Sequence, residues 1–148
     1  MVFLAEVHLP DPGQADAELR RLRELHPDLV IQLVSMRKKP NAKAVEMIAA
    51  QTIRARETGA LIAEKPEVDL LLRLAGTAQI SEAIEKAGYK ARGRRFLVGA
   101  GPDEGVARLG SHLGREEFAG RYRRIPGGRL DDEGREMVER AALLGTRN

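Results

Sequence analysis

A single arginine lies near the end of a strongly apolar stretch, and a glycine-threonine turn follows it. The run Val68–Leu74 is predicted to be a strand buried on both faces, with Arg73 near its end, and Gly76 and Thr77 then open a helix. A buried arginine is costly unless it has a partner or reaches solvent, and free amides at a helix start bind anions. We therefore predict that Arg73 and the amides of residues 77–79 bind a phosphate or a carboxylate. The structural alternative is that Arg73 pairs with an internal acid and Thr77 only caps the helix.

Two basic segments flank this turn, one after residue 36 and one after residue 89. Single-stranded RNA is held by cations that contact phosphates and by a few apolar or aromatic supports for the bases. Each charge taken singly is more simply a solvated side chain, but their clustering on both flanks favours a nucleic-acid interface, with Tyr89 as a base support. The candidate cations are Lys38, Lys39, Lys43, Lys90, Arg92, Arg94 and Arg95.

The residue types that carry most catalytic chemistry are absent or badly spaced. The chain has no cysteine, which excludes disulfides, thiolate nucleophiles and zinc fingers. The histidines His8, His26 and His112 fall in elements of different kinds without metal-ligand spacing, so we interpret them as ordinary core or surface residues. Ser111 precedes His112 on a predicted helix, where adjacent side chains point about 100° apart, so this segment is not a serine hydrolase motif. We expect no metal and no cofactor.

A glycine-rich turn over Gly99–Gly105 is the remaining candidate for an enzyme site. Asp103 and Glu104 stand where a bound phosphate would lie, and no lysine followed by serine or threonine supports a nucleotide-binding loop. We interpret the turn as a helix start with Pro102 and an acidic first turn. The acids at 131–133 are likewise interpreted as a solvated helix start rather than a metal site.

The elements that would position these residues alternate between strands and helices. Helices are predicted from Asp11 and Pro12 to about residue 26, over 41–59 with Asn41 as N-cap, over 77–88, over 102–113, and from 131 onward. In the third helix, Ile80, Ala83, Ile84 and Ala87 follow the spacing of an inward face. The chain is therefore predicted to be α/β of the α+β kind, with a mixed, mostly antiparallel sheet packed by helices. The predicted strands are Val2–Leu9, Leu29–Met36, Val68–Leu74, Phe96–Val98 and an arginine-rich edge strand at Phe118–Ile125.

Length and composition set the broad class of the protein. With 148 residues and no repeat or long linker, the chain is predicted to be one domain over residues 1–148. Its 25 lysines and arginines against 22 aspartates and glutamates give a net charge of +3, which indicates a mixed surface rather than a polybasic arm. No stretch approaches the ~20 apolar residues of a membrane span, and the first ten residues lack the basic start of a signal peptide. We expect a soluble, cytoplasmic protein.

The order of residues from Glu67 to Gly88 resembles that of a known family. The sequence Arg73, Leu74, Ala75, Gly76, Thr77, followed by Gln79, Ile80 and a helix that ends at Gly88, is similar to the smallest accessory subunit of the KEOPS complex, a family also called the PRPK-binding proteins. The start of a long alanine-containing helix at Asn41 and Ala42 resembles a second marker of this family. Together the two segments cover roughly residues 40 to 100, and the ends of the chain match only in element order and length.

The resemblance implies a function in tRNA modification. KEOPS installs threonylcarbamoyl on adenosine 37 of ANN-decoding tRNAs, with the chemistry done by a transferase subunit and regulated by a kinase-like ATPase subunit. The family implies that the accessory subunit is not an enzyme, that it binds the kinase-like subunit, and that it holds the single-stranded 3′ CCA end of tRNA. The family often has arginine where this chain has Ala78, a lost phosphate contact for which the flanking cations would compensate. The positions that match the family's motif are Asn41, Arg73, Gly76, Thr77, Gln79 and Ile80.

A second function remains open from the sequence: a protein-interaction-only regulator of an atypical small kinase. In that case the long helix from Asn41, or the last helix, would supply an apolar docking face, and the basic flanks would serve contact or solubility. The alternative is that these apolar residues only fill the core. The residues of the last helix that bear on this choice are Met137, Val138, Leu143 and Leu144.

Overall fold

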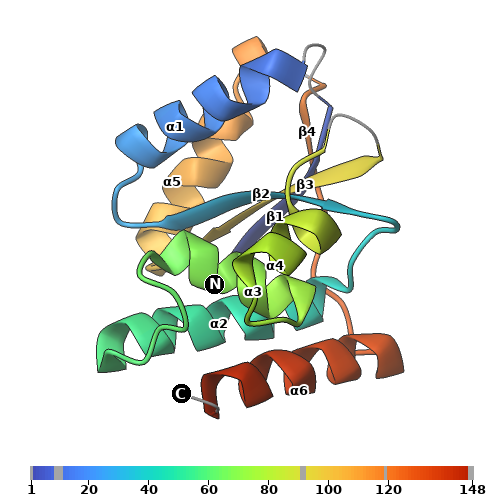
Figure 1. Ribbon diagram of the computed structural model, residues 1–148. Coiled ribbons are helices and arrows are strands. Elements are labelled where there is room, and N and C mark those ends of the chain that lie inside the picture. Colours follow the sequence, from blue (N-terminus) through green and yellow to red (C-terminus); the bar gives the residue numbers. More distant parts are fainter. Residues whose placement is uncertain (1, 9–11, 91–92, 119, 147–148) are drawn as a thin grey trace.

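Four strands form one antiparallel sheet in the computed structural model, which describes residues 2–8, 12–90, 93–118 and 120–146 (Figure 1). The strand order is β2-β3-β1-β4, and every pairing is antiparallel. The predicted α+β class, with helices packed on a mostly antiparallel sheet, is confirmed. The strands are β1 (Val2–Val7), β2 (Val30–Met36), β3 (Arg94–Ala100) and β4 (Tyr122–Arg124).

Helices cover both faces of this sheet (Figure 1). One face carries α1 (Ala15–Leu25) and α5 (Asp103–Leu113). The other carries α2 (Ala42–Thr58), α3 (Pro66–Ala75) and α4 (Ile80–Ala87), and α6 (Asp132–Thr146) packs on α2 and α3 as an outer layer. Short 3₁₀ turns lie at Pro12–Gln14 and Glu116–Phe118. None of the helices in the described ranges is both long and apolar enough to cross a membrane.

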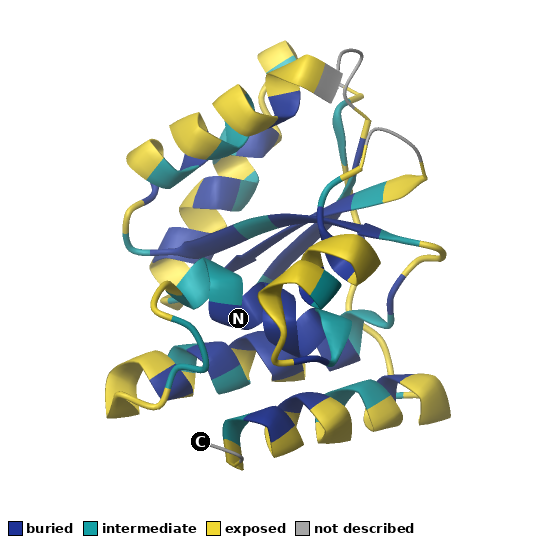
Figure 2. Ribbon diagram, in the orientation of Figure 1, coloured by how far each residue is buried: buried dark blue, intermediate teal, exposed yellow. Residues whose placement is uncertain are grey.

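The alternation of side chains along the strands divides the core in two, because successive residues of a strand point to opposite faces. On β1, Phe3, Ala5 and Val7 face α1 and α5, whereas Leu4 joins the core with α2 and α3. Figure 2 shows the buried residues along the sheet and on the helix faces turned toward it, with exposed residues on the outer faces. Both cores are apolar enough to fix the register of the sheet.

The predicted ends of the long helix are confirmed. Asn41 Oδ1 accepts a hydrogen bond from the Ala44 amide at 2.9 Å, which is the N-cap geometry. The helix ends at Gly59, whose φ of 72° is the left-handed conformation that glycine adopts without steric cost. Gly88 likewise ends α4, and α5 and the last helix begin where their acids predicted. Asp11 and Leu9, which the sequence placed at a helix cap and a strand end, lie outside the described residues.

The predicted strand Val68–Leu74 is wrong, because this segment forms the helix α3. Pro66 stands in its first turn, where its fixed φ suits a helix, and Gly76 ends it with a φ of 73°. Leucines lie on every side of α3 because the helix is surrounded by α2, α4, α6 and β2. An apolar run of this length cannot be assigned to a buried strand or a buried helix by periodicity alone.

Two smaller predictions are corrected as well. The expected edge strand Phe118–Ile125 is a strand only at Tyr122–Arg124, and Phe118 belongs to a 3₁₀ turn. On α4, Ala83 and Ala87 face inward as predicted, but Ile80 and Ile84 are 53% and 55% exposed. The helix is only eight residues long, so a narrow contact with α3 and β2 buries its small residues and leaves the isoleucines in solvent.

Candidate nucleic-acid interface

Arg73 does not reach a surface site, because its guanidinium is locked onto an acid inside the protein. Nε donates to Asp69 Oδ1 at 2.7 Å, and Nη2 donates to Asp69 Oδ2 at 3.3 Å. The two side chains are 4% and 0% exposed. The first part of the structural alternative, the pairing of Arg73 with an internal acid, is therefore the geometry that the chain adopts, and an external anion cannot reach the guanidinium.

The surroundings of this ion pair satisfy nearly every polar atom. Asp69 also accepts hydrogen bonds from Thr52 Oγ1 at 2.6 Å and from the Ile62 amide at 2.9 Å. The Nη1 group of Arg73 donates to Gln51 Oε1 and to the Ala141 carbonyl, both at 3.3 Å. Since these partners belong to α2, the 59–65 connection and α6, Arg73 and Asp69 hold three parts of the chain around α3.

The amides expected to receive an anion at the glycine-threonine turn are largely occupied. The amides of Gly76 and Thr77 both donate to the Leu72 carbonyl, at 2.8 and 3.2 Å, which closes the C-terminus of α3. Thr77 Oγ1 accepts from the Gln79 amide at 3.2 Å and donates to Glu82. The turn therefore closes the end of α3 and orders the approach to α4, whose N-cap Gln79 makes no side-chain cap hydrogen bond. The expected cradle of Arg73 with free amides is not formed.

A different arginine lies at this turn. Gly76 is covered by Arg140 of α6, whose Cδ lies 2.5 Å from the position a Cβ on Gly76 would occupy. Gly76 thus meets two requirements at once, a positive φ and space for Arg140. No acid of the described residues forms an ion pair with Arg140, which is exposed. No local sequence pattern points to Arg140, because it lies 64 positions along the chain from Gly76 and on another helix.

Arg140 borders a hollow of about 330 Å³ between α3, α4, α6 and the end of β2, which we call the corner hollow. Two further cations line it, Arg37 and Lys86. Its apolar lining comes from the end of β2 and from the three helices, and α6 also contributes the acids Glu133 and Glu136. The apolar lining residues are Met36, Leu74, Ala75, Ala87 and Met137. An apolar surface with cations at its edge suits an unstacked base and its phosphate.

The sheet register brings the two predicted basic flanks side by side. Met36 at the end of β2 is paired with Arg94 at the start of β3, so the loop after residue 36 lies next to the segment before residue 95. A second hollow of about 710 Å³ adjoins the corner hollow and shares Met36, Arg37 and Lys86 with it. Its lining adds the cation Lys90 and the acids Glu82 and Glu85. We call the cations at this end of the sheet the basic rim: Arg37, Lys38, Lys39, Lys90 and Arg94.

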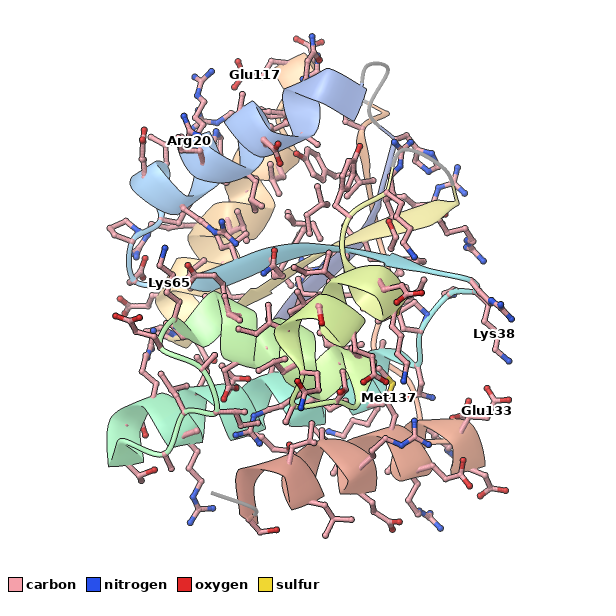
Figure 3. All side chains as sticks on the ribbon, viewed as in Figure 1. Arg20, Lys38, Lys65, Glu117, Glu133 and Met137 are labelled. Atoms are coloured by element: carbon pink, nitrogen blue, oxygen red, sulfur yellow. The ribbon has the colours of Figure 1, made fainter. Side chains whose placement is uncertain are left out.

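Acids neutralise part of the basic rim. Lys38 Nζ forms an ion pair with Glu133 at 3.0 Å, and Figure 3 shows both residues at the right of the molecule, Lys38 above Glu133. Arg94 Nη2 pairs with Glu6 at 2.9 Å, and this bonded guanidinium lowers the pKa of the Glu6 carboxyl. Lys90 Nζ bonds the Glu85 carbonyl. Arg37 and Lys39 are exposed and have no ion-pair partner among the described residues.

The other predicted cations are placed elsewhere. Lys43 lies in the first turn of α2 and pairs with Glu46 at 3.5 Å. Arg95 points to the opposite face of the sheet, where Nη1 donates to the Tyr89 hydroxyl at 3.1 Å and the guanidinium lies over the Tyr89 ring. That contact occupies the ring that was expected to stack a base. Arg92 lies outside the described residues.

The remaining motif positions divide between structure and surface. Asn41 is committed to the fold, because its Oδ1 caps α2 and its Nδ2 donates to the Arg129 carbonyl at 2.8 Å. Gln79 and Ile80 are exposed at the start of α4, as is Ala78. Of the six motif residues, Gln79 and Ile80 border the surface that a ligand can reach. Gly76 does so only through Arg140, which covers it.

Two histidines that the sequence placed in separate elements are in contact. His26 Nε2 and His112 Nδ1 lie 3.1 Å apart, joining the end of α1 to the end of α5. Burial lowers the pKa of His26, and the nearby His112 lowers it further. Among the residues that the structure describes, no three histidine, aspartate or glutamate side chains gather as metal ligands. The pair is therefore a hydrogen-bonded link between two helices.

The Gly99–Gly105 turn is closed by an acidic neighbour. A Cβ on Gly105 would collide with Asp28 Oδ2, and Asp28 is held by Arg108 at 2.9 Å. An aspartate in this place opposes phosphate binding, as the acids of the turn itself predicted.

No known family model matches the sequence, and no curated protein is significantly similar to it.

Proposed function

We propose that this chain is a non-catalytic, cytoplasmic subunit of a KEOPS-type assembly that modifies adenosine 37 of tRNA. In this role it binds the single-stranded 3′ CCA end of tRNA and the kinase-like ATPase subunit, and through the latter acts with the transferase subunit. The proposal rests on the resemblance over residues 67–88 and on one observation of geometry. Arg140, which has no ion-pair partner in the part of the chain that the structure describes, lies over the Gly76 turn of that same motif.

The surface around Arg140 has the chemical character that this ligand requires. The corner hollow combines an apolar lining with the cations Arg37 and Arg140. Its third cation, Lys86, is paired with Glu82 at 2.8 Å, and the adjoining basic rim offers a path for the phosphates of a strand. Single-stranded RNA needs this combination of stacking surface and positive groove. Because acids neutralise Lys38 and Arg94, we expect the isolated chain to bind RNA weakly and to gain affinity within the assembly by avidity.

A tRNA titration tests the proposal. Removal of the 3′ CCA end is expected to weaken binding far more than a change of anticodon. Arg140→Glu is expected to weaken binding by about tenfold and to lower the salt dependence, as loss of a phosphate contact does. Arg135→Glu, at another exposed position of α6, is the matched control and is expected to bind like the wild type. Equal binding by tRNA with and without its CCA end rejects the end-recognition proposal.

One observation favours the second candidate function, a protein-interaction-only regulator of an atypical small kinase. Ile80 and Ile84 are one turn apart on α4 and more than half exposed, and neighbouring exposed apolar side chains often mark protein contacts. The last helix fits a docking face less well, because Met137, Val138 and Leu144 face the core and only Leu143 is exposed.

Co-purification with the kinase-like subunit separates the two functions. Ile84→Glu is expected to abolish docking if α4 is the contact, whereas Leu25→Glu, at an equally exposed leucine of α1, is the control. A chain that docks the kinase-like subunit but binds no tRNA, alone or in the complex, would support the regulator.

A further inference from the structure

The strand order leaves two edges on the sheet, β2 and β4. The pairing of β1 with β4 determines which backbone groups of β4 point outward. His8 N donates to the Arg121 carbonyl and Ile125 N donates to the Leu4 carbonyl, and Glu6 faces Arg123 midway between them. Since hydrogen-bonded and non-hydrogen-bonded pairs alternate in an antiparallel ladder, Arg123 bonds β1, while the N–H and C=O groups of Tyr122 and Arg124 point away from the sheet.

The β2 edge is closed by other groups of the protein itself, two side chains and one backbone bridge. Arg23 of α1 donates from Nε and Nη2 to the Ile31 carbonyl, at 3.0 and 2.8 Å. Gln32 Oε1 accepts from the Leu33 amide at 3.0 Å, and Gly88 forms a bridge with Val34. These contacts occupy the positions where a further strand would pair.

The β4 edge has no such closure within the described ranges. No side chain of the described residues bonds the outward groups of Tyr122 or Arg124, and the main contact of β4 is with β1. Arg123 and Arg124 are exposed and point to opposite faces of the sheet. Neither forms an ion pair with a described acid, although Arg124 lies over the Phe3 ring. The edge therefore combines free backbone groups with positive charge on both faces.

We propose that the β4 edge is a docking site for an extended acidic segment of a partner protein, which adds as a fifth strand. The backbone of the segment would bond the outward N–H and C=O groups of Tyr122 and Arg124. Acidic side chains of the segment would lie beside Arg124 on one face and Arg123 on the other, as cross-strand neighbours do. This surface is separate from the corner hollow, so the inference does not depend on the tRNA proposal.

The alternation of donors and acceptors favours a peptide over a nucleic acid. Arginines alone would serve either ligand, but an N–H and a C=O that repeat with the strand period are complementary to another strand, as in recognition by strand addition. Short, charged edges also discourage aggregation. Protection against aggregation does not require arginine in particular. If that were the only role of the β4 edge, the edge would not bind an acidic strand.

The test uses the full chain and a defined probe, the seven-residue peptide Val-Glu-Glu-Val-Glu-Glu-Val with blocked ends, which places glutamates on both faces of a strand. Binding is measured by fluorescence anisotropy, and hydrogen exchange reports on the amides of Tyr122 and Arg124. Saturable binding that protects both amides is expected. A peptide with glutamine in place of glutamate is expected to bind at least about tenfold more weakly.

Two substitutions at one position separate backbone pairing from charge. Arg124→Ala removes the charge but keeps the N–H, whereas Arg124→Pro also removes the N–H, which an edge strand tolerates because that group faces solvent. Arg124→Pro is expected to bind the probe about tenfold more weakly than Arg124→Ala, with both variants folded by circular dichroism and unchanged in tRNA binding. Equal affinity of the two variants, absence of amide protection, or displacement of the peptide by an oligouridine that protects the same amides would each overturn the proposal.

Discussion

The guanidinium of Arg73 and the carboxylate of Asp69, four residues apart on α3, form an ion pair that almost no solvent reaches. Arg73 stands within the motif that resembles an RNA-binding family, yet its hydrogen bonds run to α2, α3 and α6. A charge in this position supports the packing of the helical layer, and it affects a ligand only through the position of its neighbours.

Substitution of Arg73 is expected to destabilise the chain rather than to weaken tRNA binding selectively. Arg73→Ala leaves the Asp69 carboxylate buried without its counter-charge, a loss that typically costs about 3 to 5 kcal/mol. Arg73→Glu is expected to cost more, because it places a second carboxylate beside the first. Urea denaturation measures the change in unfolding free energy.

The control for this prediction is the double variant Asp69→Leu with Arg73→Met. Since replacement of a buried ion pair by apolar side chains of similar size is often nearly neutral, the double variant is expected to be more stable than Arg73→Ala alone. A variant Arg73→Ala that unfolds within about 0.5 kcal/mol of the wild type, the range of an ordinary surface substitution, would show that the ion pair does not support the fold.

The sequence predicted local features well where a residue acts through its own backbone. Asn41 as N-cap, Gly59 and Gly88 as helix stops, and the acidic first turn of α5 all follow from short-range rules. It failed where the environment decides. The leucines of α3 are buried on all sides, which removes the periodic signal that separates helix from strand, and that error placed Arg73 at a surface it does not reach. Arg140 and the His26–His112 pair depend on contacts between distant segments, which no local pattern carries.

Substitution of Gly76 is expected to affect both stability and RNA binding. Gly76→Ala places a Cβ at a φ of 73° and against Arg140 Cδ, so it strains the backbone by about 1 kcal/mol and displaces the guanidinium from the corner hollow. Gly59→Ala is a matched control, because Gly59 has a φ of 72° with nothing within 4 Å. Both variants are expected to lose similar stability in urea denaturation, and only Gly76→Ala to lose tRNA affinity. Equal tRNA affinity of the two variants would show that Arg140 is not part of the tRNA-binding surface.

Acidification is expected to destabilise the link between α1 and α5. The pKa of His26 is lowered in the folded chain, chiefly by burial, from an ordinary value of 6.5. The unfolded chain therefore binds a proton at a higher pH than the folded chain does, and stability falls as the pH drops below about 6.5. His26→Gln is expected to flatten this part of the curve. Denaturation midpoints between pH 7.5 and pH 5 measure the effect, and parallel curves for wild type and variant would contradict it.

Release of Arg94 from Glu6 is expected to strengthen RNA binding. The carboxylate of Glu6 holds the Arg94 guanidinium at 2.9 Å and so competes with a phosphate for one of the cations of the basic rim. Glu6→Gln removes that competitor and one negative charge from the surface, and we expect a gain in tRNA affinity of about threefold at low salt that disappears as salt screens the charges. Glu24→Gln, which removes an exposed acid of α1, controls for the change in net charge. If both variants gain equally, net charge explains the effect and Arg94 makes no phosphate contact. If Glu6→Gln alone gains, Arg94 belongs to the interface.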